Sequence, residues 1–311
     1  MPNWKEVLDE IKEYANNNPK SNPLDEVRRK YISEIPEKTG RNIIFYYSGW
    51  LQKPGIEEVI VNDKDKQAFM VTIHKLDRNK GLDIVLHTPG GDLAATESII
   101  DYLHKMFNND IRAIIPQISM SAGTIIALSC KEIMMGKQSN LGPIDPQIGG
   151  VACQAVLDEF ESAKKDIRNN PSAIPLWQSI IGKYHPTFLG KCKQSIDWSE
   201  SLVKEWLMLN MCNGDENLAN KIIKEFADHS TQKTHARHIS IDKCKNAGLK
   251  IVDMEEDNDL QDLILTAHHA YMHTFANTNA VKIVENQLGT AYIEQVTVPQ
   301  PPNIRINPPN R

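Results

Sequence analysis

Ser121 lies among small residues just ahead of an apolar run, in the segment SMSAGT at residues 119–124. The apolar run that follows predicts a buried helix opening near Ser121. A serine hydroxyl at this position could attack a carbonyl carbon if a base accepted its proton, and a helix N-terminus favours the negative charge that then develops. A serine at a helix start is also commonly a simple N-cap.

A pair of glycines, Gly90 and Gly91, forms the second candidate feature, in HTPGGDL at residues 87–93. Paired glycines let the backbone turn sharply and approach a ligand closely. Such a turn can aim amide N–H groups at an oxyanion. The plainer interpretation is a strand-to-helix turn in which Asp92 caps the helix.

Alternating strands and helices would place both features at one edge of a sheet. Apolar runs typical of buried strands occupy residues 42–47, 82–87, 111–116 and 131–135, and the intervening segments have helical spacing, notably residues 63–76 and 93–107. This alternation predicts an α/β fold with a largely parallel sheet covered on both faces. The two features and a third loop, SNLGPIDPQ at residues 139–147, follow successive strands, where ligands bind in such folds.

The remainder of the chain is predicted to be largely helical. Helical spacing occurs at residues 4–15, 24–35, 152–168, 177–184, 199–211, 217–227 and 259–275. Five prolines after residue 296 predict an extended or disordered tail. The expected organisation is an N-terminal helical extension at residues 1–40, a main domain at 41–275, and a C-terminal extension at 276–311 with a proline-rich tail.

Composition excludes several classes of function. The net charge of −5 argues against a nucleic-acid partner. No run approaches the roughly 18 apolar residues of a membrane span, and the N-terminus lacks the pattern of a secretory signal, so a cytoplasmic location is expected. Five scattered cysteines without a CxxC pair predict neither a disulfide framework nor a metal site. The histidines at 268, 269 and 273 lack a spaced carboxylate or cysteine partner for zinc.

The segment at residues 84–147 resembles the serine dehydrogenase proteinase family, which is related to signal peptide peptidase A and the Clp-type ATP-dependent peptidase. The matching motifs are TPGG at residues 88–91, SMSAG at 119–123 and LGPIDPQ at 141–147. The resemblance implies a Clp-peptidase/crotonase-like fold, in which a largely parallel sheet is flanked by helices and a long handle-type helix follows the core. It also implies a serine peptidase.

The resemblance assigns roles to individual residues. Ser121 falls on the nucleophile, and the backbone N–H groups of Gly91 and Ala122 fall on the oxyanion hole. The substrate, an extended or unfolded peptide, would lie beside Gly90, with Pro143 also in contact.

The resemblance further implies a homo-oligomer, in which the helix at residues 152–168 is the expected interface. No cofactor is expected, since the GxGxxG spacing of dinucleotide-binding turns is absent. A phosphate-binding GxxxxGK[ST] motif is also absent from the sequence, so any unfolding motor would be a separate protein.

The general base is left open by the sequence. Clp-type peptidases have a Ser-His-Asp triad, but Asp145 stands near the position of their histidine. Signal peptide peptidases have a Ser-Lys dyad, for which Lys165 is the candidate, with Lys164 and Lys183 nearby in the sequence. A neutral imidazole from His235 or His238 is the other choice.

Each candidate base also has a plainer interpretation. Lys164 and Lys165 follow Glu161 at the spacing of solvated helical ion pairs, and Asp145 between two prolines suits a turn. Two other functions therefore stay open: an acyl-CoA enzyme of the crotonase type, and a non-catalytic peptide-binding scaffold. Fold alone does not decide among them.

Overall fold

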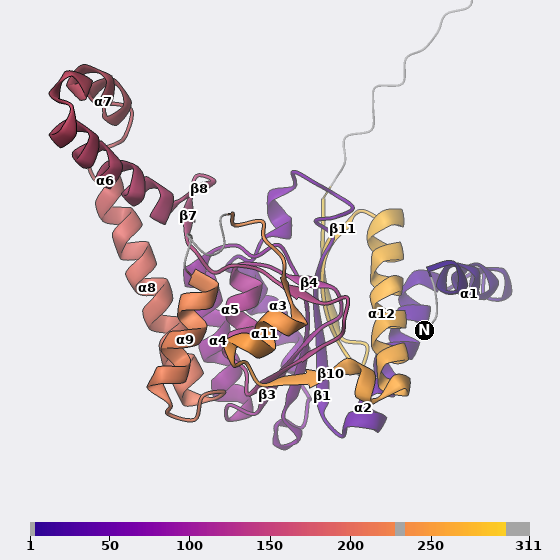
Figure 1. Ribbon diagram of the computed structural model, residues 1–311. Coiled ribbons are helices and arrows are strands. Elements are labelled where there is room, and N and C mark those ends of the chain that lie inside the picture. Colours follow the sequence, from indigo (N-terminus) through magenta and orange to yellow (C-terminus); the bar gives the residue numbers. More distant parts are fainter. Residues whose placement is uncertain (1–3, 228–233, 297–311) are drawn as a thin grey trace, which may run out of the picture.

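The computed structural model describes residues 4–227 and 234–296 of the chain. Its centre is a seven-stranded sheet with the strand order β10-β5-β3-β2-β1-β11-β12 (Figure 1). The strands are β1 (Asn42–Ser48), β2 (Leu82–His87), β3 (Ile111–Ile115), β5 (Glu132–Met135), β10 (Ile251–Asp253), β11 (Ala280–Asn286) and β12 (Ala291–Gln295). The first five pair in parallel, and β11 and β12 are antiparallel to their neighbours. The predicted α/β class and largely parallel sheet are therefore confirmed.

Helices cover both faces of the sheet because successive strand residues point to opposite sides. In β1, Ile44 and Tyr46 pack into the core beneath α3 (Lys64–Ile73), α4 (Leu93–Phe107) and α5 (Ala122–Leu128). The alternate residues Phe45 and Tyr47 pack against α2 (Pro23–Thr39) and α12 (Asn258–Asn277) on the other face (Figure 1). This burial on both faces explains why the strands are continuous apolar runs.

The N-terminal helices pack against elements near the C-terminal end of the described chain. In α1 (Trp4–Asn17), Val7 and Ile11 pack against Val27 and Ala270. In α2, the buried Arg28 donates to Glu285 of β11, with 2.6 Å between Nε and Oε2. The N-terminal segment 1–40 was expected as a separate extension, but its described residues 4–40 contribute to the covering of the sheet.

A helical arm follows the core. It comprises α6 (Cys153–Asn169), α7 (Ile174–Ile181) and α8 (Phe188–Leu209), and α6 and α7 extend away from the sheet (Figure 1). A small cluster that includes Cys153, Val156 and Cys192 joins α6 to α8. The helix predicted after the core at residues 152–168 is confirmed as α6. The chain returns through α9 (Glu216–Ala227) and α11 (Ile241–Ala247).

Short strands build the loops near the carboxyl end of the sheet. β4 (Ile118–Ser119), β6 (Asn140–Leu141) and β9 (Ile239–Ser240) form a small sheet, and β7 (Gln147–Ile148) pairs with β8 (Val151–Ala152).

Residues 276–295 differ from the expected extension, because they contain two strands of the main sheet. β11 carries Lys282 and Glu285, whose charges hide the apolar pattern of a buried strand, yet both side chains are fully buried against charged partners. Most of the predicted proline-rich tail, residues 297–311, lies outside the described residues. In the described parts of the chain, no helix combines the length and apolarity needed to cross a bilayer.

Candidate active site

Ser121 stands at a strained corner between β4 and α5. Its backbone has φ 51° and ψ −116°, a conformation that residues with a Cβ rarely adopt. Hydrogen bonds hold the corner on both sides: Met120 N donates to Thr88 O at 3.0 Å, and Gly123 N donates to Met120 O at 2.8 Å. Strain of this kind persists only where the surrounding structure imposes it, and it is concentrated at functional sites.

Gly90 packs directly against this corner. A Cβ on Gly90 would lie 2.5 Å from the Cβ of Ser121, and the φ of Gly90 is +97°. Its N–H donates to Thr88 Oγ1 at 3.2 Å and its carbonyl accepts from Val61 N at 2.8 Å. The N–H and the C=O of Gly90 are thus both hydrogen-bonded within the protein. A glycine is required at this position because Ser121 approaches it so closely.

Gly91 presents its own N–H on the edge opposite Val61. Val61 pairs with the turn through Gly90 O and through Asp92 N, which donates to Val61 O at 2.9 Å. In this parallel pairing the N–H and C=O of Gly91 point away from Val61. Within the described residues, neither the Gly91 N–H nor the Ala122 N–H donates a hydrogen bond. Two amide donors are therefore free beside Ser121, as an oxyanion hole requires.

These groups line one pocket of about 270 Å³. Its wall is formed by the glycine turn, the Ser121 corner, the loop at residues 144–147 and one face of α8. The lining residues are Gly91, Asp92, Leu93, Ser121, Ala122, Ile125, Ile144, Asp145, Pro146, Gln147, Ser195, Trp198 and Ser199. The three loops that the sequence places at one sheet edge do converge.

Asp145 joins this pocket to His235. His235 Nδ1 lies 2.8 Å from Asp145 Oδ1. The Asp145 side chain is 3% exposed and that of His235 is 23% exposed. The second carboxylate oxygen, Asp145 Oδ2, is buried without a hydrogen-bond partner in the described structure. The pair thus combines a pocket-lining carboxylate with an imidazole accessible from solvent.

A model of the ClpP-like SDH-type serine proteinase family matches residues 20–284. The chain belongs to this family.

Two archaeal proteins of Methanocaldococcus jannaschii are similar to parts of this SDH-type chain. Uncharacterized protein MJ0137 is 32% identical over 111 residues, which cover 36% of this chain and 38% of that protein. Uncharacterized protein MJ1495 is 28% identical over 188 residues, which cover 60% of this chain and 58% of that protein. The chain therefore spans less than two thirds of the length of these curated relatives.

The lysines considered as bases lie away from the pocket of this SDH-type proteinase. Lys165 is exposed on α6, in the arm that extends from the sheet (Figure 1). Lys164 pairs with Glu161 at 2.5 Å on the same helix, and Lys183 is exposed after α7. None of the three lysines lines the pocket. A catalytic role for Lys165 would require the pocket of a second copy.

Two other residues predicted from the sequence, Pro143 and His238, do not line the pocket. Pro143 is buried and does not line the pocket, whereas the next four residues do. His238 is exposed, three residues beyond the His235 that contacts Asp145.

Sequence reasoning missed two contributors to the site. Val61 fixes the glycine turn from a loop before α3, and Trp198 of α8 lines the pocket. A lone valine in a loop carries no motif. Trp198 is 39% exposed, so a solvent-facing aromatic on a charged helix was the one available signal.

Buried histidines lie close to the glycine turn but do not line the pocket. Burial lowers the pKa of His87 to about 4, and His87 Nδ1 lies 3.2 Å from Ser48 O. Burial also lowers the pKa of His268 well below its ordinary value. Both rings are therefore neutral and structural at physiological pH.

No metal centre is evident in residues 4–227 and 234–296, where no three potential ligands gather. His268 Nδ1 lies 3.2 Å from the Tyr47 hydroxyl, and His273 Nε2 lies 3.0 Å from Trp4 O. These two histidines of α12 thus contact protein groups.

Proposed function

We propose that this chain hydrolyses peptide bonds through an acyl-enzyme on Ser121. The observation that carries the proposal is the strained Ser121 corner, which stands on a pocket beside the unpaired N–H groups of Gly91 and Ala122. A residue that served only as an N-cap would accept a hydrogen bond from the first turn of its helix. The Ser121 side chain makes no such bond.

In the first step, Ser121 Oγ attacks the carbonyl carbon of the scissile peptide bond as its proton leaves. The oxygen of the tetrahedral intermediate receives hydrogen bonds from Gly91 N–H and Ala122 N–H. Removal of one such donor typically costs about 10²- to 10³-fold in rate. Collapse of the intermediate breaks the C–N bond, and water then hydrolyses the ester on Ser121.

The Asp145–His235 pair is the proposed proton acceptor. Asp145 lines the pocket and its Oδ2 is unpartnered, while its Oδ1 contacts His235. The pair would take the proton from the Ser121 hydroxyl and return it to the leaving amine.

Compared with the Clp-type Ser-His-Asp triad, the histidine and the aspartate would have exchanged positions in this chain. An aspartate stands near the place of the triad histidine, and a histidine comes from the segment just before β9. The lysine arrangement of signal peptide peptidases would instead need Lys165 from a second copy, since α6 leads away from its own pocket (Figure 1).

The substrate would be an extended peptide. The Gly91 carbonyl accepts no hydrogen bond within the described residues and offers a backbone edge to which such a peptide can add as a strand. The exposed arm of α6 and α7 is the proposed contact between copies in a homo-oligomer.

Cleavage of an unfolded protein tests this function. The wild-type chain is expected to produce peptides from it, whereas Ser121→Ala with unchanged circular dichroism is expected to produce none. Equal cleavage by both proteins would refute the proposal. Turnover of an acyl-CoA thioester by both would favour the crotonase alternative.

A further inference from the structure

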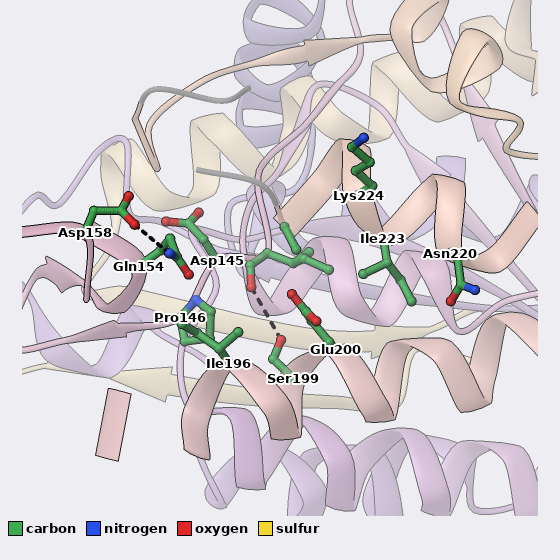
Figure 2. Close-up of a pocket in the computed structure, with 12 residues that line it drawn as sticks. Asp145, Pro146, Gln154, Asp158, Ile196, Ser199, Glu200, Asn220, Ile223 and Lys224 are labelled. Carbon is green, nitrogen blue, oxygen red and sulfur yellow. Dashed lines mark hydrogen bonds between the residues drawn. The ribbon is translucent and has the colours of Figure 1, made fainter. Parts of the chain in front are cut away.

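A second cavity adjoins the catalytic pocket. Its volume is about 490 Å³, and it shares Ile144, Asp145, Pro146 and Ser199 with the pocket that holds Ser121. Faces of α6, α8 and α9 complete it (Figure 2). A peptide bound at Ser121 could therefore extend a nearby side chain into this space.

Carboxylates dominate the charge of the cavity. Asp158 of α6 and Glu200 of α8 line it, and in Figure 2 they lie on opposite sides of Asp145. Asp158 accepts from Gln154 Nε2 at 2.8 Å. Among the described residues, neither Asp158 nor Glu200 makes an ion pair. Two carboxylates therefore line the cavity without an ion-pair partner in the described parts of the chain.

Among the residues that the structure describes, Lys224 of α9 is the one lysine or arginine that lines this cavity. In Figure 2 the ammonium of Lys224 points away from Glu200. Asp145 adds a third negative charge, and its Oδ2 is buried without a partner in the described part of the chain. Among the lining residues that the structure describes, three carboxylates stand against one ammonium, and this balance favours a positive ligand.

The rest of the lining mixes neutral polar and apolar groups. Gln154, Ser199 and Asn220 supply the polar groups, and Ile144, Pro146, Ile196, Ile223 and Ala227 form an apolar surface. Such a surface suits the methylene stem of a lysine or arginine side chain, which buries its carbon chain while its charged head meets polar groups.

We infer that this cavity is a substrate subsite for a lysine or arginine side chain within two residues of the scissile bond. The inference rests on the proposed peptidase function. Asp158 and Glu200 are the specificity-determining residues, and Asp145 separates the subsite from the nucleophile. Partly exposed charge pairs of this kind are each worth a few-fold in affinity.

A peptide library tests the subsite. Cleavage sites of the wild-type chain, mapped by mass spectrometry, are expected to be enriched in lysine or arginine at one position within two residues of the cut. The double variant Asp158→Asn, Glu200→Gln should lose about fivefold of this preference and retain cleavage at neutral sites. The matched control is Glu161→Gln, which removes a charge from the outer part of α6 and should keep the preference.

The possible outcomes distinguish failure of the subsite proposal from failure of the peptidase proposal. Cleavage at Ser121 without any basic preference, or with a preference unchanged in the double variant, would overturn the subsite alone. Absence of Ser121-dependent cleavage from the wild-type chain would overturn both proposals. If the double variant does not fold, the single variant Glu200→Gln decides by the same readout.

Discussion

Lys282 Nζ lies 2.8 Å from Asp65 Oδ1, and both side chains are fully buried. Lys282 Nζ also donates to Ile60 O at 2.7 Å, and Asp65 Oδ2 accepts from Asn62 N at 2.9 Å. The ion pair thus fixes the residues on either side of Val61. Val61 in turn pairs with the glycine turn. The buried Lys282–Asp65 ion pair therefore helps to hold the glycine turn of the proposed oxyanion hole in place.

Lys282→Met is expected to destabilise the fold strongly. The substitution leaves the Asp65 carboxylate buried without its counter-charge, which typically costs about 3–5 kcal/mol. Urea unfolding measures the loss. The control is Lys64→Met, which breaks the more exposed pair with Glu294 and should change the unfolding free energy little. Equal effects of the two variants would show that the buried pair is not a support.

Gly90→Ala is expected to disable Ser121, the proposed nucleophile. Its new Cβ would lie 2.5 Å from the Cβ of Ser121, so the corner must shift, and small misplacements of this kind can cost about 10²-fold in rate. The rate of reaction with a fluorophosphonate measures the effect. Gly40→Ala has a similarly positive φ of +67° in open space. It should retain the wild-type labelling rate, and retention by Gly90→Ala would contradict the packing described.

The residues of the candidate site that lie in contiguous motifs are predicted from the sequence. Ser121, Gly91 and Ala122 belong to short segments after strands, and parallel strands bring such segments to one edge. Asp145 and His235 are 90 residues apart, and no local pattern joins them. The strand β11 was missed because Lys282 and Glu285 break its apolar pattern. Their burial depends on partners that only the tertiary fold supplies.

Substitution of either residue of the proposed Asp145–His235 proton acceptor should slow hydrolysis. Asp145→Asn removes the pocket-lining carboxylate and His235→Gln removes the imidazole behind it. General-base catalysis contributes about 10²- to 10⁴-fold, so kcat/KM for a peptide substrate should fall by that order in each variant. Lys165→Ala should leave kcat/KM unchanged. The reverse pattern would assign the base to a lysine of a second copy.

Acid should weaken the fold through His87. Its pKa is about 4 in the folded chain against an ordinary 6.5, so the unfolded chain binds a proton first as the pH falls. The unfolding free energy should decrease by about 3 kcal/mol between pH 6.5 and pH 4 on this account, with no further contribution below pH 4. Urea unfolding across this range should show a shallower slope for His87→Gln. An equal slope would show that His87 does not titrate in this way.

The most direct measurement is the mass of the chain after reaction with a fluorophosphonate. The proposed role of Ser121 predicts the addition of one phosphonyl group, located by peptide mapping on Ser121 and absent from Ser121→Ala. A folded wild-type chain that gains no group, or gains it on another residue, would contradict Ser121 as the nucleophile.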